Sequence, residues 1–286
     1  MELFIGPRIE RLIELALDED EVGFDVTSAA FFDAEDVGSA HLVAKEPLVM
    51  AGADVASAVF HRVDDELSFL PQVEDGESAD QGHVIARVHG PVGSMLRAER
   101  IALNFLQRMC GVATHTARHV EAVHGTAVEV VDTRKTLPGW RSLDKYAVRC
   151  GGGGNHRFNL AGGVMIKDNH VAAAGDVALA IRRVKNQAPH TLRIEVEVER
   201  LDQVEPAVEH GAGVVMLDNM SNETMQRAVE IIRDHPRGGE VVIEASGNMT
   251  VDRLETLGDI GLDVVSVGAL THSAPAVDIS MRMDDE

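Results

Sequence analysis

The sequence has few cysteines, few lysines and no long hydrophobic run. Its two cysteines, Cys110 and Cys150, exclude a disulfide framework and a four-thiolate zinc site. No run approaches the roughly 18 apolar residues that a membrane-spanning helix requires. The first residues lack the basic region and apolar core of a secretory signal. We therefore expect a cytoplasmic protein without a membrane span.

Positive charge is also scarce. The 26 lysines and arginines face 47 aspartates and glutamates, which gives a formal net charge of -21, and only five of the basic residues are lysines. This balance argues against nucleic acid or an anionic membrane as a partner, since proteins bind polyanions through basic patches. An acidic surface with little lysine favours adaptation to high salt, where screening relieves self-repulsion. An ordinary acidic enzyme is the alternative interpretation.

The first part of the chain combines helical and strand patterns. Apolar residues recur at helical spacing from Pro7 to Asp20, and again over residues 94–109. Between these two helices, short alternating runs separated by glycine-rich turns predict antiparallel strands near residues 40–43, 66–70 and 83–88. The first 110 or so residues therefore predict a mixed α+β domain.

The rest of the chain has a different pattern of apolar residues. Short runs rich in valine and isoleucine alternate with helical patterns, which indicates parallel strands joined by helical crossovers. No glycine-rich dinucleotide fingerprint opens any of these units, so a β/α barrel is favoured over a Rossmann fold. The six predicted strands cover residues 128–131, 164–166, 194–198, 214–217, 241–243 and 264–267.

Charged residues and glycines stand at the ends of these strands, where a barrel places its active site. Residues 132–170 carry a net charge of about +4 within this acidic chain, which predicts a substrate with several carboxylates or phosphates. Glu195 and Glu197 share one face of their strand, and Asp218 ends the next, so a magnesium ion is expected there. Ser246-Gly247 and Gly268 suit a phosphate group. Together these features predict a reaction on a phosphorylated sugar.

Several long motifs resemble a known family. FDVTS and AERIALNFLQRMCGVAT lie in the first part of the chain, and DTRKTLPGWRSLDKYAVRCGGGGNHRFNL begins at Asp132. VMIKDNH, EVEVE, VMLDNM, EASGNM and SVGALTHS follow in order. From about Asp25 to the C-terminus, the chain resembles the quinolinate phosphoribosyltransferases, which are decarboxylating enzymes of NAD biosynthesis.

The resemblance implies an α/β protein in which an N-terminal α/β sandwich domain precedes an open seven-stranded α/β barrel. The sandwich would span residues 1–110 and be joined by the tail 274–286, and the barrel would span residues 111–273. The implied activity is that of a magnesium-dependent pentosyltransferase. It transfers the phosphoribosyl group of 5-phosphoribosyl-1-pyrophosphate to quinolinate, and the products are nicotinate mononucleotide, pyrophosphate and carbon dioxide.

The resemblance also implies roles for individual residues. Lys135, Glu197 and Asp218 would be catalytic, with Glu197 and Asp218 holding Mg²⁺ directly or through water. The quinolinate carboxylates would be held by Arg134, His156, Arg157 and Lys167, and by Arg100 of a neighbouring subunit, so at least a homodimer is expected. The phosphoribosyl donor would contact Lys135, Glu197, Asp218, Ser246, Gly247, Gly268 and His272.

Other interpretations of the sequence stay open. A nicotinate phosphoribosyltransferase, a molybdenum-transport-associated homologue and a non-catalytic phosphate-binding barrel are the alternatives. The chain departs from the family pattern in the fourth glycine of residues 151–154 and in the phenylalanine of FDVTS. His115, His119 and His124 could bind zinc, although a solvated helix is the simpler interpretation. Trp140 and Tyr146 could cover the substrate ring or pack in the core.

Overall fold

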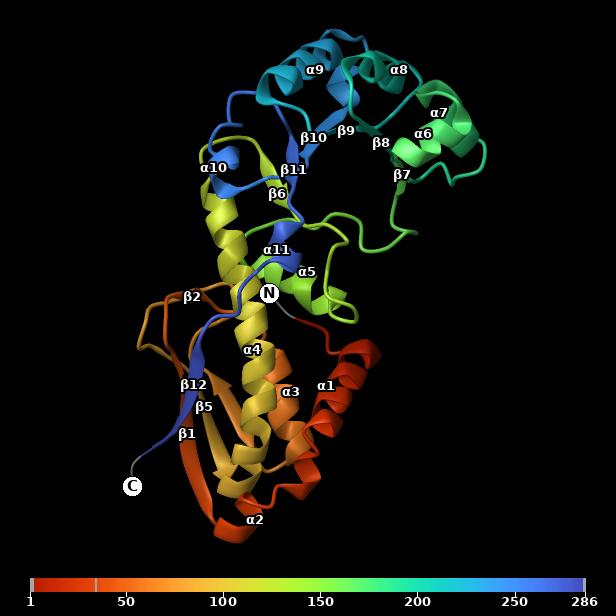
Figure 1. Cartoon of the computed structure of the whole chain (residues 1–286). Coiled ribbons are helices and arrows are strands. Elements are labelled where there is room, and N and C mark those ends of the chain that lie inside the picture. Colours follow the sequence, from red (N-terminus) through yellow and green to blue (C-terminus); the bar gives the residue numbers. More distant parts are fainter. Residues whose placement is uncertain (1–2, 34, 285–286) are drawn as a thin grey trace. The chain divides into compact units, whose positions relative to one another are not determined.

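A computed structural model describes residues 3–33 and 35–284 of the chain (Figure 1). The chain divides into two compact units. The first unit comprises Met1–Ala117, Thr136–Gly152 and Leu270–Glu286, and the second comprises Arg118–Lys135 and Gly153–Ala269. Within the described residues, no helix has the length and hydrophobicity needed to cross a membrane.

The first unit is built on a four-stranded antiparallel sheet of strand order β12-β1-β5-β3. Leu42 and Ala40 of the central strand are fully buried, as the predicted alternation requires. The last strand of the chain, β12, pairs with β1 from Ala40 to Ala44. The strands of this unit are β1 (Val37–Ala44), β2 (Leu48–Val49), β3 (Ser68–Pro71), β4 (Ser78–Ala79), β5 (Val84–Pro91) and β12 (Ile279–Met283), of which β2 and β4 form a separate pair.

Helices complete the first unit. Phe60 of α3 stacks on Phe69 of β3 with ring centroids 5.7 Å apart, which joins helix and sheet. The helices are α1 (Pro7–Glu19), η1 (Val22–Phe24), α2 (Ser28–Phe31), α3 (Ala53–Val63), α4 (Val92–Glu121) and α5 (Arg141–Cys150), with the turn α11 (Ala269–His272) at the boundary. Helix α4 runs well past the predicted end at residue 109. Its Gly111 does not break the helix but lets the chain at Pro275 approach closely, since a Cβ there would lie 2.1 Å from the Pro275 carbonyl oxygen.

The second unit is a parallel sheet of six strands in the order β6-β11-β10-β9-β8-β7. All six strands coincide with the predicted runs to within a few residues. They are β6 (Glu129–Val131), β7 (Val164–Ile166), β8 (Ile194–Val198), β9 (Val214–Asp218), β10 (Val242–Ser246) and β11 (Val264–Ser266). The seventh position of the barrel is reduced to a single parallel bridge between Gly154 and Val131 of the edge strand β6.

Short helical segments connect the strands of the parallel sheet. Helices α6 to α9 lie side by side along the sheet (Figure 1). Side chains of Asp176, Ser221 and Thr250 cap three of these helices by accepting backbone N–H groups, which fixes where each helix begins after its strand. The helical segments are α6 (Asp168–Ala174), α7 (Val177–Lys185), η2 (Leu201–Gln203), α8 (Val204–Glu209), α9 (Asn222–Asp234), η3 (Gly238–Glu240) and α10 (Val251–Leu254).

The division into units differs from the predicted boundaries at residues 111–117, 136–152 and 270–273, of which the second segment is the longest. Residues 136–152, which contain α5, were expected in the barrel but belong to the first unit. Two buried contacts explain this. Asp144 of α5 forms an ion pair of 3.2 Å with Arg108 of α4, and the Tyr146 hydroxyl donates to Asp75 at 2.8 Å.

Candidate active site

The carboxyl ends of the parallel strands surround a cavity of about 610 Å³. All of its lining residues belong to the second unit. This is the position at which β/α barrels carry their active sites, because the loops after the strands converge there. The lining residues are Thr133, Arg134, Lys135, His156, Arg157, Met165, Lys167, Glu197, Met216, Asp218, Asn219, Ser246, Gly247, Asn248 and Ser266.

Most of the predicted site residues line this cavity, and three are not among its lining residues. Nine line the cavity: Arg134, Lys135, His156, Arg157, Lys167, Glu197, Asp218, Ser246 and Gly247. Gly268 does not line it, and Arg100 and His272 belong to the first unit. Six lining residues were not among the predicted site residues: Thr133, Met165, Met216, Asn219, Asn248 and Ser266.

One side of the cavity is basic and centres on Arg157. Its Nη1 donates to the Gly163 carbonyl at 2.8 Å, and its Nη2 contacts the Met165 sulfur at 3.5 Å. Its Nε is buried and has no hydrogen-bond partner among the described residues. Burial lowers the pKa of Arg157, and the nearby positive charge of Arg134 acts in the same direction. An anionic ligand would satisfy this donor and relieve the repulsion.

The cavity also carries two carboxylates, Glu197 and Asp218. Lys167 Nζ donates to Glu197 Oε2 at 2.7 Å, and the Glu197 side chain is 12% exposed. Burial and the negative charge of Glu197 raise the pKa of Asp218. Asp218 lies in register with Ser246, and Ser246 with Ser266, so three polar residues form one row across β9, β10 and β11. The carboxylate oxygens of Glu197 and Asp218 suit a hard divalent cation.

The loops after β9 and β10 hold unusual backbone conformations. Asn219 and Asn248 have φ values of 54° and 51°, and Gly247 has a φ of 96°. A Cβ on Gly247 would lie 2.2 Å from Asn219 Oδ1, so only glycine fits. Arg253 braces both loops by donating to the carbonyls of Gly247 and Met220 at 2.8 and 2.6 Å.

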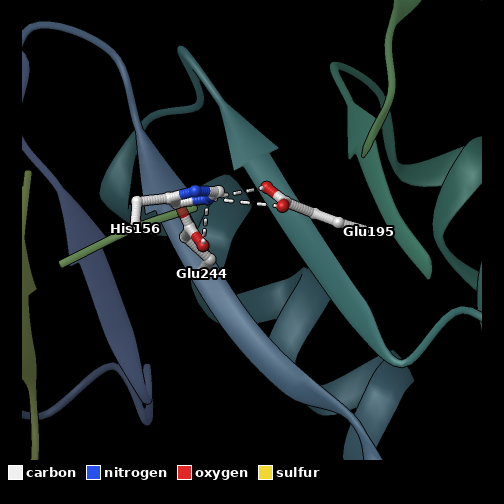
Figure 2. Close-up of side chains that lie close together, drawn as sticks. All are labelled: His156, Glu195 and Glu244. Carbon is white, nitrogen blue, oxygen red and sulfur yellow. Dashed lines mark hydrogen bonds and ion pairs between the residues drawn. The ribbon is translucent and has the colours of Figure 1, made fainter. Parts of the chain in front are cut away.

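His156, which lines the cavity, forms a cluster with two buried carboxylates, Glu195 and Glu244 (Figure 2). His156 Nε2 lies 3.3 Å from Glu195 Oε2 and 3.6 Å from Glu244 Oε2. Asp132, which is fully buried, accepts the backbone N–H of His156 at 2.9 Å and Asn155 Nδ2 at 2.8 Å. Burial and the negative charge of Glu195 raise the pKa of Glu244 to about 7.

The contacts of the described residues decide two questions that the sequence left open, the role of Trp140 and Tyr146 and the zinc site of the three histidines. Trp140 stacks on Phe105 of α4 with ring centroids 5.0 Å apart, and the Tyr146 ring is buried, so both take part in packing within the first unit. Within residues 3–33 and 35–284, the only group of three or more potential metal ligands is His156, Glu195 and Glu244. His115, His119 and His124 therefore do not form such a group.

Comparisons with known proteins agree with this geometry. The sequence profile "Quinolinate phosphoribosyl transferase, N-terminal domain" matches residues 25–110, and the profile for the C-terminal domain matches residues 112–282. A "Probable nicotinate-nucleotide pyrophosphorylase [carboxylating]" of Bacillus subtilis is 38% identical over 96% of this chain and 93% of its own.

A "Quinolinate phosphoribosyltransferase [decarboxylating] 1b" of Nicotiana tabacum is also 38% identical, over 97% of this chain and 83% of its own. The solved structure of NadC from Streptococcus pyogenes superposes with a TM-score of 0.93 at 40% identity, and the match covers 100% of both chains. Both halves of the sequence and the whole fold thus match the same proteins. The chain belongs to the quinolinate phosphoribosyltransferase family.

Proposed function

We propose that the protein transfers the phosphoribosyl group of 5-phosphoribosyl-1-pyrophosphate to quinolinate and releases carbon dioxide and pyrophosphate. One observation carries the proposal: a single cavity is lined both by an arginine with an unsatisfied donor and by a pair of carboxylates. Such a cavity suits a dianionic acceptor on one side and a sugar that becomes positively charged on the other. Family membership supports the same conclusion.

On the acceptor side, Arg134, Arg157 and Lys167 are proposed to hold the two carboxylates of quinolinate. Arg157 is proposed to bind a carboxylate through its buried Nε, where water screens the interaction little. Holding both carboxylates fixes the pyridine nitrogen for attack on the anomeric carbon, which lowers the entropic part of the barrier. The ring nitrogen becomes cationic on ribosylation and accepts the electron pair left by the departing carboxylate.

On the donor side, Lys135 is proposed to neutralise the pyrophosphate that leaves. Glu197 and Asp218 would stabilise positive charge on the ribose and bind its hydroxyl groups. Ser246 and Gly247 are proposed to hold the 5-phosphate, and the absence of a side chain on Gly247 lets the phosphate approach the backbone closely. Gly268 and His272 are proposed to contribute to this phosphate region.

Magnesium is proposed as the cofactor, held by Glu197 and Asp218 directly or through water. The raised pKa of Asp218 supports this assignment, because part of its cause is repulsion from Glu197, which a bound cation would relieve. Mg²⁺, when bound, supplies positive charge that stabilises the departing pyrophosphate.

The decisive experiment follows product formation. Purified protein is incubated with Mg²⁺, 5-phosphoribosyl-1-pyrophosphate and quinolinate, with nicotinate replacing quinolinate in a parallel reaction. We expect nicotinate mononucleotide and carbon dioxide from quinolinate only, and loss of turnover with EDTA that added Mg²⁺ restores. Product from nicotinate only would identify a non-decarboxylating transferase. Absence of product from both in folded protein, tested from low to high salt, would contradict the proposal.

We also propose that the active unit is at least a dimer, in which Arg100 of one subunit completes the acceptor site of the other. Arg100 belongs to the first unit and is not among the cavity residues, which is consistent with a role in trans. Mixing inactive Arg100→Ala and Lys167→Ala proteins is expected to restore about a quarter of the wild-type sites, since half the dimers are mixed and each regains one site. Absence of recovery despite measured subunit exchange would contradict the shared site.

The cytoplasm is the proposed location. Both cysteines are buried and free, as a reducing compartment allows. The strongly negative net charge argues against nucleic acid as a partner.

A further inference from the structure

Hydrogen bonds join the two loops that follow β9 and β10. Both loops contribute lining residues to the cavity, Asn219 after β9 and Gly247 and Asn248 after β10. The Asn219 backbone N–H donates to the Ser246 carbonyl at 3.0 Å, and Asn248 Nδ2 donates to Asn219 Oδ1 at 3.4 Å. The positive φ values of Asn219, Gly247 and Asn248 turn both loops away from the extended backbone of their strands.

Arg253 of α10 holds the same two loops by their carbonyl groups. Its Nη1 donates to the Gly247 carbonyl at 2.8 Å, and its Nη2 donates to the Met220 carbonyl at 2.6 Å. Arg253 is half-buried, so water competes little for these hydrogen bonds. The planar guanidinium, with its fixed fork of donors, thereby connects the loop after β9 to the loop after β10.

The helix that carries Arg253 is itself fixed. Thr250 Oγ1 accepts the Arg253 backbone N–H at 3.3 Å and caps α10, and Leu254 is buried, with 1% of its surface exposed. Thr256 Oγ1 donates to the Arg253 carbonyl at 2.7 Å and accepts from Asn222 Nδ2 of α9 at 2.8 Å. The Arg253 side chain therefore extends from a packed helix that is connected to the start of α9.

The hydrogen bond to Gly247 sets the direction of a backbone donor at the cavity. The peptide bond after Gly247 is trans, and in a trans peptide the carbonyl and the following N–H point in opposite directions. Holding the Gly247 carbonyl thus fixes the direction of the Asn248 N–H. Arg253 is not among the lining residues of the cavity, so it acts on a ligand only through these loops.

We propose that Arg253 is a positioning residue for the 5-phosphate of the phosphoribosyl donor. By joining the Gly247 and Met220 carbonyls, it keeps the loops after β9 and β10 in the conformation that binds this phosphate. The inference rests on the proposed function, in which Ser246 and Gly247 hold the 5-phosphate.

The strand order predicts that Arg253 serves the donor and not the acceptor. Arg134 and Lys167, which are proposed to hold quinolinate, follow β6 and β7, the two edge strands of the parallel sheet. Strand β11 separates β6 from β10, and β8 separates β7 from β9. Loss of the Arg253 hydrogen bonds should therefore change donor binding more than quinolinate binding.

Steady-state kinetics tests this difference. In Arg253→Ala we expect the KM for 5-phosphoribosyl-1-pyrophosphate to rise about tenfold and the KM for quinolinate to change less than about twofold. Arg253→Lys keeps the positive charge without the planar fork, so a positioning role predicts a similar rise, whereas an effect of charge alone predicts a wild-type KM. A donor KM close to wild type in either variant, or an equal rise for both substrates, would overturn the proposal.

Arg233 provides the matched control. Its Nη1 donates to the carbonyls of Gly238 and Val241 at 3.0 and 2.9 Å, just before β10, whereas Arg253 holds the loop that follows this strand. Arg233→Ala also removes hydrogen bonds between an arginine and backbone carbonyls, and it is expected to lower the melting temperature without changing the donor KM. An equal rise of the donor KM in Arg233→Ala would attribute the effect to stability and overturn the positioning role.

Hydrogen exchange of the intact protein tests the role of Arg253 without the reaction. Backbone amides of residues 218–221 and 246–249 are expected to exchange faster in Arg253→Ala than in wild type or Arg233→Ala. Unchanged exchange would overturn the inference whatever the kinetics show. If wild-type protein does not convert quinolinate, the proposed function fails, and the exchange experiment then decides by itself whether Arg253 holds the two loops.

Discussion

At the scale of single residues, Lys135 offers a direct test of charge at the donor site. It is exposed at the cavity, and its backbone N–H donates to Thr133 Oγ1 at 3.1 Å, a hydrogen bond that an alanine at this position keeps. Lys135→Ala is expected to lower kcat about 100-fold and leave the melting temperature unchanged. Lys45→Ala, outside the cavity, is the control in the same steady-state assay. An unchanged kcat in Lys135→Ala would contradict the donor role.

The raised pKa of Glu244 predicts that the free energy of unfolding depends on pH. Its pKa is raised from 4.5 to about 7, so the folded state binds a proton that the unfolded chain has already lost. The free energy of unfolding therefore falls as pH rises through this window. Glu244→Gln, which keeps the size without the charge, is expected to stabilise the protein more at about pH 8 than at about pH 5. Urea unfolding at both values measures this, and an equal effect at the two values would refute it.

The residues of the cavity were predictable where they end a strand. Arg134, Lys167 and Asp218 each follow a valine- or isoleucine-rich run, and the parallel arrangement brings such ends together. The support of His156 by Asp132 was not predictable, because it joins residues 24 positions apart through a loop conformation that periodicity does not encode. Ser266 was missed because, as a small residue within a strand, it resembles an ordinary core position.

At the scale of elements, strands were easier to predict than the segments between them. Each buried parallel strand is visible in the sequence as a short apolar run. Helix α4, in contrast, continues through Gly111, where the close approach of Pro275 requires a glycine, and a glycine does not indicate a helix. The placement of α5 with the first unit depends on Arg108 and Asp75, and no local pattern reports those partners.

The loop after β10 carries a prediction of its own. Gly247→Ala puts a side chain at a φ of 96° and against Asn219 Oδ1. We expect the free energy of unfolding to fall by about 1–3 kcal/mol and the KM for the phosphoribosyl donor to rise. Gly239→Ala is the control, because a Cβ there meets nothing within 4 Å. Denaturant unfolding and donor titrations measure both effects, and a wild-type KM would mean that this backbone does not hold the phosphate.

At the scale of the whole molecule, the net charge of -21 predicts a response to salt. If the surface is adapted to high salt, raising KCl from about 0.1 M to about 2 M should increase the melting temperature, because screening weakens repulsion among the carboxylates. Potassium chloride is varied at constant pH and the transition is followed by circular dichroism. Full stability in dilute buffer would contradict the adaptation and leave an ordinary acidic enzyme.

The pairing of β12 with β1 has a consequence for synthesis on the ribosome. The first sheet is complete only when Ile279–Met283 reaches Ala40–Ala44, and every strand of the barrel is translated before that segment. The nascent chain therefore exposes one edge of β1 until Ile279–Met283 has been made, whereas β7 to β11 can pair one after another as they emerge. The antiparallel sheet is thus completed only after every strand of the parallel sheet has been made.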